Sequence, residues 1–229
     1  MRMISRSLLW AAALASWCSA ATAAPVIWTD WTDTEVNTVN GSLTVGSDTI
    51  DVTYSGQFTA PTQTNGGTNY WSPSAPYVSA TVDNAPPSAD IIAINTVGVR
   101  TITFSQAVEE LFIAIVSLNG NNGYDFGVPT DIISFGTGYW GSGTLVSAFG
   151  GNGVTSTGEG HGVIKLSGNF TSISFNATVA EHWNGFTIGV GGLADEEPPV
   201  NVPEPATLGL LGVGLLGIAT ALRRNRRAA

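Results

Sequence analysis

Two histidines, each close to an acidic residue, are the side chains best suited to acid–base chemistry in this chain of 229 residues. Glu159 lies two residues before His161, so on a strand both side chains would point to the same face. Glu181 directly precedes His182, and adjacent residues on a strand point to opposite faces. A histidine–carboxylate pair can transfer protons or hold a metal, but polar loop residues more often form turns. The pairs alone do not predict catalysis, and the sequence is interpreted as that of a protein that is not an enzyme.

An oxygen-rich turn contains the candidate metal ligands Asn119, Asn121 and Asp125. Calcium prefers hard oxygen donors, and the glycines between these residues allow tight bends. The turn has one carboxylate and lacks the order of an EF-hand, which favours an ordinary Asx turn. The sequence therefore predicts no cofactor, with Ca²⁺ at this turn as the open alternative.

The aromatic residues Tyr70, Trp71 and Tyr77 lie in a segment, 56–89, that is rich in Pro, Asn, Ser and Thr and has few strand signals. A loop of this length in a compact domain is often functional. Exposed aromatic rings stack on sugar rings, although tryptophan is more often packed inside a protein. These three residues are the candidate glycan-binding site.

Residues 136–141 match the glycine spacing of a dinucleotide-binding fingerprint. That fingerprint functions only when its last glycine begins a helix whose N-terminus faces the pyrophosphate. Here a strand-like pattern follows, so these residues are interpreted as a glycine-rich turn.

The middle of the chain is strongly acidic. Residues 24–202 contain 16 acidic residues against two basic ones, Arg100 and Lys165, for a net charge of −14. Nucleic-acid binding requires basic side chains that neutralise phosphates, so nucleic acid is excluded as a partner.

The N-terminal segment has the order of a secretory signal peptide. Two arginines precede the apolar residues 8–17, and small residues follow up to Ala23. Signal peptidase is expected to cleave between Ala23 and Ala24. Residues 1–23 include Cys18, so the mature chain is expected to contain no cysteine, no disulfide and no thiolate nucleophile.

The C-terminal segment has three parts. Pro203, Glu204 and Pro205 come first, and the uncharged residues 206–222 follow. These 17 residues would form a helix about 26 Å long at ~1.5 Å per residue, near the short end of a membrane span. A basic cluster at 223–227 then contains four arginines: Arg223, Arg224, Arg226 and Arg227. The positive-inside rule predicts that these arginines stay in the cytoplasm while the region before the helix is exported.

In this order, residues 202–227 resemble the PEP-CTERM sorting signal. The resemblance implies that an exosortase, a membrane-embedded cysteine protease, recognises and cleaves the chain near the motif at 203–205. The predicted partners are therefore signal peptidase, an exosortase and the membrane. The protein is expected to be anchored by its C-terminal helix before processing, and to be at the cell surface or outside the cell afterwards.

The region between the two ends has the pattern of β-strands. Apolar and polar residues alternate in 50–55 and 186–190, as on strands with one solvent-facing side. Residues 111–116 are continuously apolar, which predicts a central strand buried on both sides. Separate strands are expected at 99–105 and 110–117, among roughly ten in all. Many short strands predict an all-β fold: an antiparallel two-sheet sandwich that is jelly-roll-like.

The domain boundaries follow from these patterns. The sandwich is assigned to residues 24–192, and residues 193–202 are interpreted as an acidic linker that contains proline. The domain also resembles a β-sandwich that is common among PEP-CTERM proteins. The matching stretches are 28–32, 113–118, 158–164 and 181–187.

The predicted function is that of an exported cell-surface or extracellular-matrix protein with a non-enzymatic structural role. Two alternatives remain open. One is a carbohydrate-binding module for exopolysaccharide, and the other is a glycan-active enzyme, which would need paired carboxylates in a cleft.

Overall fold

The computed structural model describes residues 25–87 and 90–194. Within them the chain forms thirteen strands, and every pairing between strands is antiparallel. The strands are β1 (Ile27–Trp28), β2 (Asp30–Glu35), β3 (Thr38–Val45), β4 (Asp48–Ser55), β5 (Thr59–Gln63), β6 (Ile91–Ile94), β7 (Gly98–Leu118), β8 (Gly123–Asp125), β9 (Thr130–Phe135), β10 (Leu145–Ala148), β11 (Gly153–Ser156), β12 (Gly160–Ala177) and β13 (Asn184–Leu193). Two short 3-10 helices complete the set: η1 (Ala75–Tyr77) and η2 (Phe149–Gly151). The predicted all-β antiparallel class is confirmed.

The two longest strands, β7 and β12, bend and contribute to two layers of the sheet. The first half of β7 pairs with β4, whereas its second half pairs with β13. Glu110 lies between the halves with a φ of 51°, and the β7–β12 register shifts between Leu166 and Asn169. The strands predicted at 99–105 and 110–117 are therefore one bent strand. Alternation marks the two faces of a strand but not whether a strand continues through a bend.

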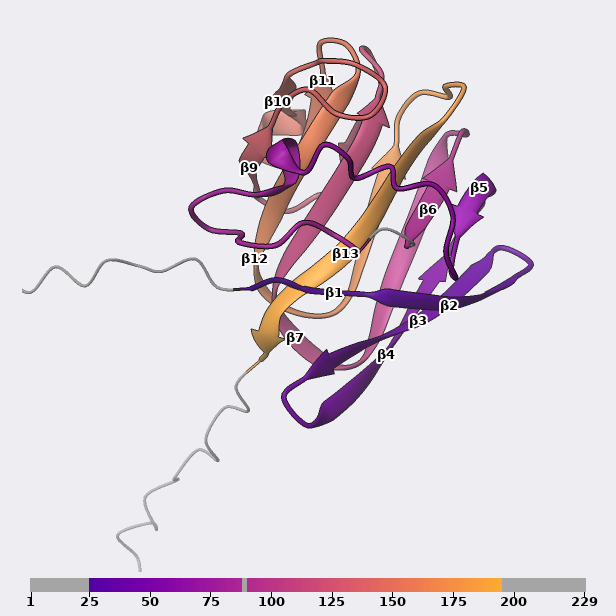
Figure 1. Ribbon diagram of the computed structural model, residues 1–229, viewed down its shortest axis with the longest axis vertical. Helices are drawn as coiled ribbons and strands as arrows, with labels where there is room; N and C mark the ends of the chain where they lie inside the picture. The colour runs from indigo at the N-terminus through magenta and orange to yellow at the C-terminus, as the bar shows by residue number, and fades with distance from the viewer. Residues whose placement is uncertain (1–24, 88–89, 195–229) are drawn as a thin grey trace, which may run out of the picture. The chain divides into compact units, whose positions relative to one another are not determined.

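One layer contains, in order, β2, β3, β4, the first half of β7, the second half of β12, β8, β11 and β10. The other layer contains, in order, β9, the first half of β12, the second half of β7 and β13. On its side away from β7, β13 pairs with both β6 and β1. Figure 1 shows β12, β7 and β13 running side by side, with β2, β3 and β4 grouped below them. The arrangement is sandwich-like, and its assignment as a jelly roll stays a prediction.

The run at 111–116 is buried on both faces, as predicted. Its odd-numbered side chains belong to the larger core cluster, with Tyr54 and Phe186. Its even-numbered side chains belong to a second cluster on the opposite face, with Trp71 and Tyr77. Because strand side chains alternate between faces, one apolar run can contribute to two cores.

Residues 56–87 of the long segment contribute Tyr70, Trp71, Tyr77 and Val82 to the second cluster. Its helix η1 contacts β12 and β9, and in Figure 1 the segment passes in front of β12 and β13. The segment also contains β5, which the sequence pattern did not predict because its residues, Thr-Ala-Pro-Thr-Gln, are mostly polar and include a proline. The strands β8 and β11, with three and four residues, were missed for a similar reason: their strand geometry depends on the partners they meet.

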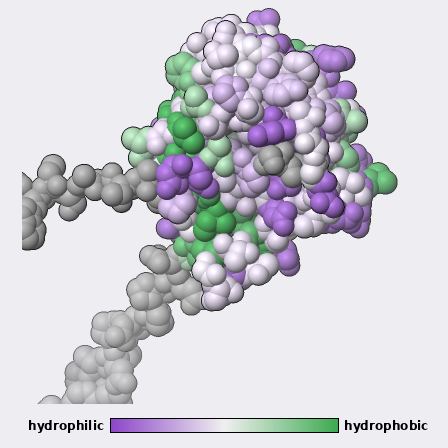
Figure 2. All heavy atoms as spheres, viewed as in Figure 1, coloured by the Kyte–Doolittle hydropathy of each residue, from purple (hydrophilic) through white to green (hydrophobic). Residues whose placement is uncertain are grey.

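Polar residues dominate the face of the domain shown in Figure 2, and strongly hydrophobic residues gather in small areas of it. This distribution is typical of a domain whose apolar side chains are mostly enclosed in the core.

Candidate functional site

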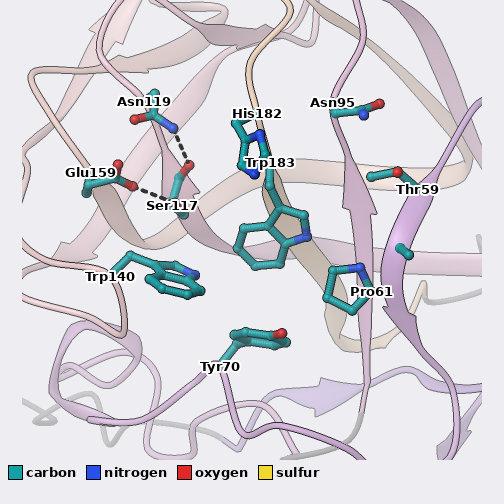
Figure 3. A pocket seen from close by; sticks show the side chains of 11 residues that line it. Thr59, Pro61, Tyr70, Asn95, Ser117, Asn119, Trp140, Glu159, His182 and Trp183 are labelled. Carbon is teal, nitrogen blue, oxygen red and sulfur yellow. Dashed lines mark hydrogen bonds between the residues drawn. The ribbon is translucent and has the colours of Figure 1, made fainter.

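A cavity of about 700 Å³ lies at one edge of the sheet. At this edge β6 and β7 end and β12 and β13 begin, so four neighbouring strands bring their adjoining loops together. Figure 3 shows the lining side chains arranged around the cavity. The lining consists of aromatic, amide, hydroxyl, carboxylate and imidazole side chains with two small apolar residues: Thr59, Ala60, Pro61, Tyr70, Asn95, Ser117, Asn119, Trp140, Glu159, His182 and Trp183.

One wall of the cavity is a continuous group of aromatic rings. The ring of Tyr70 lies 5.0 Å from Trp183 and 5.1 Å from Tyr139, measured between centroids. Trp140 lies 4.9 Å from Tyr139 and 6.5 Å from Trp183. We call Tyr70, Tyr139, Trp140 and Trp183 the aromatic wall. Trp140 is 56% exposed, so the wall has an accessible aromatic face beside the cavity.

The glycine-rich turn at 136–141 positions two rings of this wall. The amide of Gly138 donates to the carbonyl of Gly141 at 2.9 Å, which places Tyr139 and Trp140 at the tip of the turn. Gly138 packs on the ring of His161 so closely that a Cβ there would overlap the imidazole. In the structure the sequence forms a turn at this point, with no helix after it.

The other side of the cavity is polar. The hydroxyl of Ser117 donates to one carboxylate oxygen of Glu159, and the side-chain amide of Asn119 donates to the carbonyl oxygen of Ser117 at 3.4 Å (Figure 3). The indole nitrogen of Trp183 is buried without a hydrogen-bond partner among the described residues. The cavity therefore combines hydrogen-bonding groups with apolar aromatic faces.

His161 is fully buried and contacts Ser117, a residue that lines the cavity, but the two are not arranged as in a catalytic triad. Its Nδ1 accepts from the backbone amide of Ser117 at 3.3 Å and lies 3.3 Å from the hydroxyl of Tyr77. The hydroxyl of Ser117 donates to Glu159 instead, so the histidine is not placed to take its proton. Burial lowers the pKa of His161 from 6.5 to about 4, and the imidazole is neutral at pH 7.

This burial leads to a prediction for the titration of His161. The chain has two histidines, so a His182→Gln variant leaves His161 as the single imidazole signal in an NMR titration. The signal should stay unchanged from about pH 8 down to about pH 5, because the folded state excludes the proton. Since unfolded chains bind that proton below about pH 6.5, the folded state should lose stability as the pH falls from 6.5 to 4. A midpoint near pH 6.5 in the folded protein would contradict the assignment.

Glu181 connects the two loops at the edge of the cavity. Its carboxylate accepts from the backbone amide of Asn119 at 3.1 Å and from the side-chain amides of Asn119, Asn122 and Asn184. Asn184 in turn accepts from the hydroxyl of Tyr124. Glu181 therefore ties the turn after β7 to the loop that contains His182 and Trp183. It is a positioning residue for the cavity.

The candidate calcium ligands lie around this same turn. The side-chain amide of Asn119 donates to Glu181, and Oδ1 of Asp125 accepts from the amide of Gly127 at 3.1 Å. Asn121 is exposed and has a φ of 82°. Across the described residues, no three His, Cys, Asp or Glu side chains are grouped closely enough to hold a metal ion. The calcium site stays a prediction that these contacts do not test.

The three candidate glycan-binding aromatics are divided between the cavity and the core. Tyr70 lines the cavity, whereas Trp71 and Tyr77 are 2% and 0% exposed and meet edge to face at 5.1 Å. Their rings are covered by the domain itself, so of the three only Tyr70 is placed to contact a ligand. Trp140 and Trp183, which were not predicted as site residues, supply the other rings.

Several predicted sites lie outside the described residues. These are the signal cleavage position at Ala23 and Ala24, the motif at Pro203, Glu204 and Pro205, the helix at 206–222, and the basic cluster at 223–227. In the part of the chain that the structure describes, no helix has the length and apolar character needed to span a membrane.

Comparison with known proteins identifies the C-terminal segment. Residues 201–227 match the model of the PEP-CTERM protein-sorting motif. No curated protein and no solved structure matches the chain. The predicted sorting signal is thus confirmed at the residues that suggested it. The chain contains the PEP-CTERM sorting motif of an exported protein that is anchored in the membrane, sorted by an exosortase and then processed.

Proposed function

We propose that the β-domain is a non-catalytic carbohydrate-binding module of a cell-surface or extracellular-matrix protein, with exopolysaccharide as its ligand. The observation that supports this most strongly is the cavity, in which an aromatic wall faces hydroxyl, amide and carboxylate groups.

Sugars require this combination of surfaces. The C–H face of a pyranose packs on an aromatic ring, and its hydroxyls need donors and acceptors around the rim. Trp140 and Trp183 supply faces, while Asn95, Asn119 and Glu159 supply polar atoms.

The cavity favours binding over hydrolysis. Most glycoside hydrolases use two carboxyl groups placed roughly 5–10 Å apart across the scissile bond. Glu159 is the one carboxylate among the residues that line this cavity. Glu181 does not line the cavity, and its carboxylate is occupied by three asparagine side chains.

Export agrees with this function. The sorting motif is that of an exported protein, and export to the cell surface or beyond would bring the domain to exopolysaccharide.

A Trp140→Ala variant tests the proposal. The full chain would be purified in a polyoxyethylene detergent, which has no sugar headgroup, and its affinity for neutral and charged oligosaccharides would be measured by calorimetry. Loss of one central aromatic contact should weaken binding by roughly 2 kcal/mol, or about thirtyfold. Phe135→Ala is the matched control, because Phe135 is 50% exposed and does not line the cavity. Absence of oligosaccharide binding, or equal losses in both variants, would overturn the proposal.

A further inference from the structure

We infer that the cavity selects glycans with free amino groups, such as de-N-acetylated hexosamine polymers, over neutral or acidic ones. This inference rests on the proposed carbohydrate-binding function and adds the class of sugar. It follows from the juxtaposition of a carboxylate that pairs with no lysine or arginine, an aromatic wall, and a domain whose described lysine and arginine are both occupied elsewhere.

Glu159 has a free hydrogen-bonding position. One carboxylate oxygen, Oε2, accepts from Ser117, while Oε1 makes no hydrogen bond to any described residue. The bond from Ser117 holds the carboxylate at the cavity lining without neutralising its charge. A ligand ammonium group can supply both the missing hydrogen bond and the missing counter-ion.

Neither the arginine nor the lysine of the described domain compensates Glu159. Arg100 is 1% exposed and donates to the backbone carbonyls of Gly98 and Thr96. Lys165 forms an ion pair with Glu110 at 2.6 Å. Glu159 therefore has no lysine or arginine partner among the described residues.

The aromatic wall favours the same kind of ligand. Cations bind over the faces of tryptophan and tyrosine because the ring quadrupole is negative there. Tyr70, Trp140 and Trp183 line the same cavity as Glu159, so an amino sugar could stack its ring on one face while its ammonium group lies near a second face and the carboxylate. A neutral sugar would use the stacking surface and leave the charge unbalanced.

The net negative charge of the domain also favours a cationic glycan. The described residues contain thirteen acidic side chains against two basic ones, a net charge of −11. Such a field attracts polycations and repels uronate, sulfate and phosphate polymers at low ionic strength. Long-range attraction by the net charge does not by itself create a binding site. The experiment therefore has to distinguish binding in the cavity from attraction by the whole domain.

The test compares tetramers of glucosamine, N-acetylglucosamine and galacturonic acid with the full chain in a polyoxyethylene detergent. At about pH 6 an amine with the ordinary pKa of an α-amino group is protonated. The glucosamine tetramer should bind at least about tenfold more tightly than the acetylated one, a difference of about 1.4 kcal/mol, and the galacturonate tetramer should not bind. Glu159→Gln should remove this preference, so that the glucosamine and N-acetylglucosamine tetramers bind this variant with equal affinity.

Glu109→Gln is the matched control. Glu109 is an exposed carboxylate that does not line the cavity, so its substitution changes the net charge of the domain equally without changing the site. Equal losses in Glu159→Gln and Glu109→Gln would mean non-specific attraction and would overturn the inference. Equal binding of neutral and amino tetramers, both dependent on Trp140, would overturn it while the carbohydrate-binding function stands. Failure of every tetramer and of neutral glucans to bind would overturn both.

Discussion

Replacing Glu181 with alanine should lower the free energy of unfolding by about 3 kcal/mol, the larger of two stability effects that follow from contacts at the cavity. The carboxylate accepts from one backbone amide and three asparagine side chains, so its removal leaves four donors without their acceptor. Hydrogen bonds to a charged group contribute roughly 1.5–3 kcal/mol each, but Glu181 is partly exposed and water will replace some of them. The expected loss is therefore well below the sum.

Thermal unfolding of the full chain would measure this effect. For a domain of this size, a loss of about 3 kcal/mol lowers Tm by roughly 6–12 °C. Glu35→Ala is the control, because Glu35 is an exposed carboxylate at the end of β2, and its removal should change Tm by no more than a degree or two. Similar melting curves for Glu181→Ala and Glu35→Ala would show that Glu181 does not hold the two loops together.

Replacing Gly138 with alanine should cost about 2–3 kcal/mol, because the new methyl group would overlap His161. A Cβ at this position would lie closer than 3.0 Å to three atoms of the His161 side chain, which is itself fully buried. Either the imidazole or the glycine-rich turn has to move. Since the turn positions Tyr139 and Trp140, oligosaccharide affinity should fall together with stability.

Gly136→Ala provides a control within the same turn. The nearest atoms to a Cβ at Gly136 belong to Pro76 at 3.7 and 3.9 Å, an ordinary contact distance, so this variant should lose less than about 1 kcal/mol. A double-mutant cycle with His161→Ala tests whether overlap with the imidazole causes the loss of stability. The destabilisation by Gly138→Ala should largely vanish once the ring is absent. An unchanged cost in that background would locate the strain elsewhere.

The central strand was predictable from the residues because its signal is local. The run at 111–116 has no polar residue, which predicts burial on both faces, and both faces are buried. Its continuation through Glu110 into one strand of 21 residues was not predictable. The bend depends on pairing with β12 and on a backbone conformation that the alternation pattern does not encode.

The hydrogen bonds around Glu181 are a second feature that the sequence did not predict. Its position beside His182 suggested acid–base chemistry, with neighbouring side chains on opposite faces of a strand. In the structure these residues lie in a loop before β13, where Glu181 meets three asparagines and His182 lines the cavity. Asn119 lies 62 positions before Glu181, and no local pattern predicts a contact over that separation.

The sorting signal and the cavity were encoded in different ways. The sorting motif at 201–227 is a linear order of Pro-Glu-Pro, apolar stretch and basic cluster, so the residue types were sufficient to recognise it. The aromatic wall instead joins Tyr70, Trp140 and Trp183 from three separate loops, and burial removes Trp71 from the same surface. Composition can count aromatic rings, but which of them face a ligand is decided by the strand ends that the tertiary structure brings to one edge.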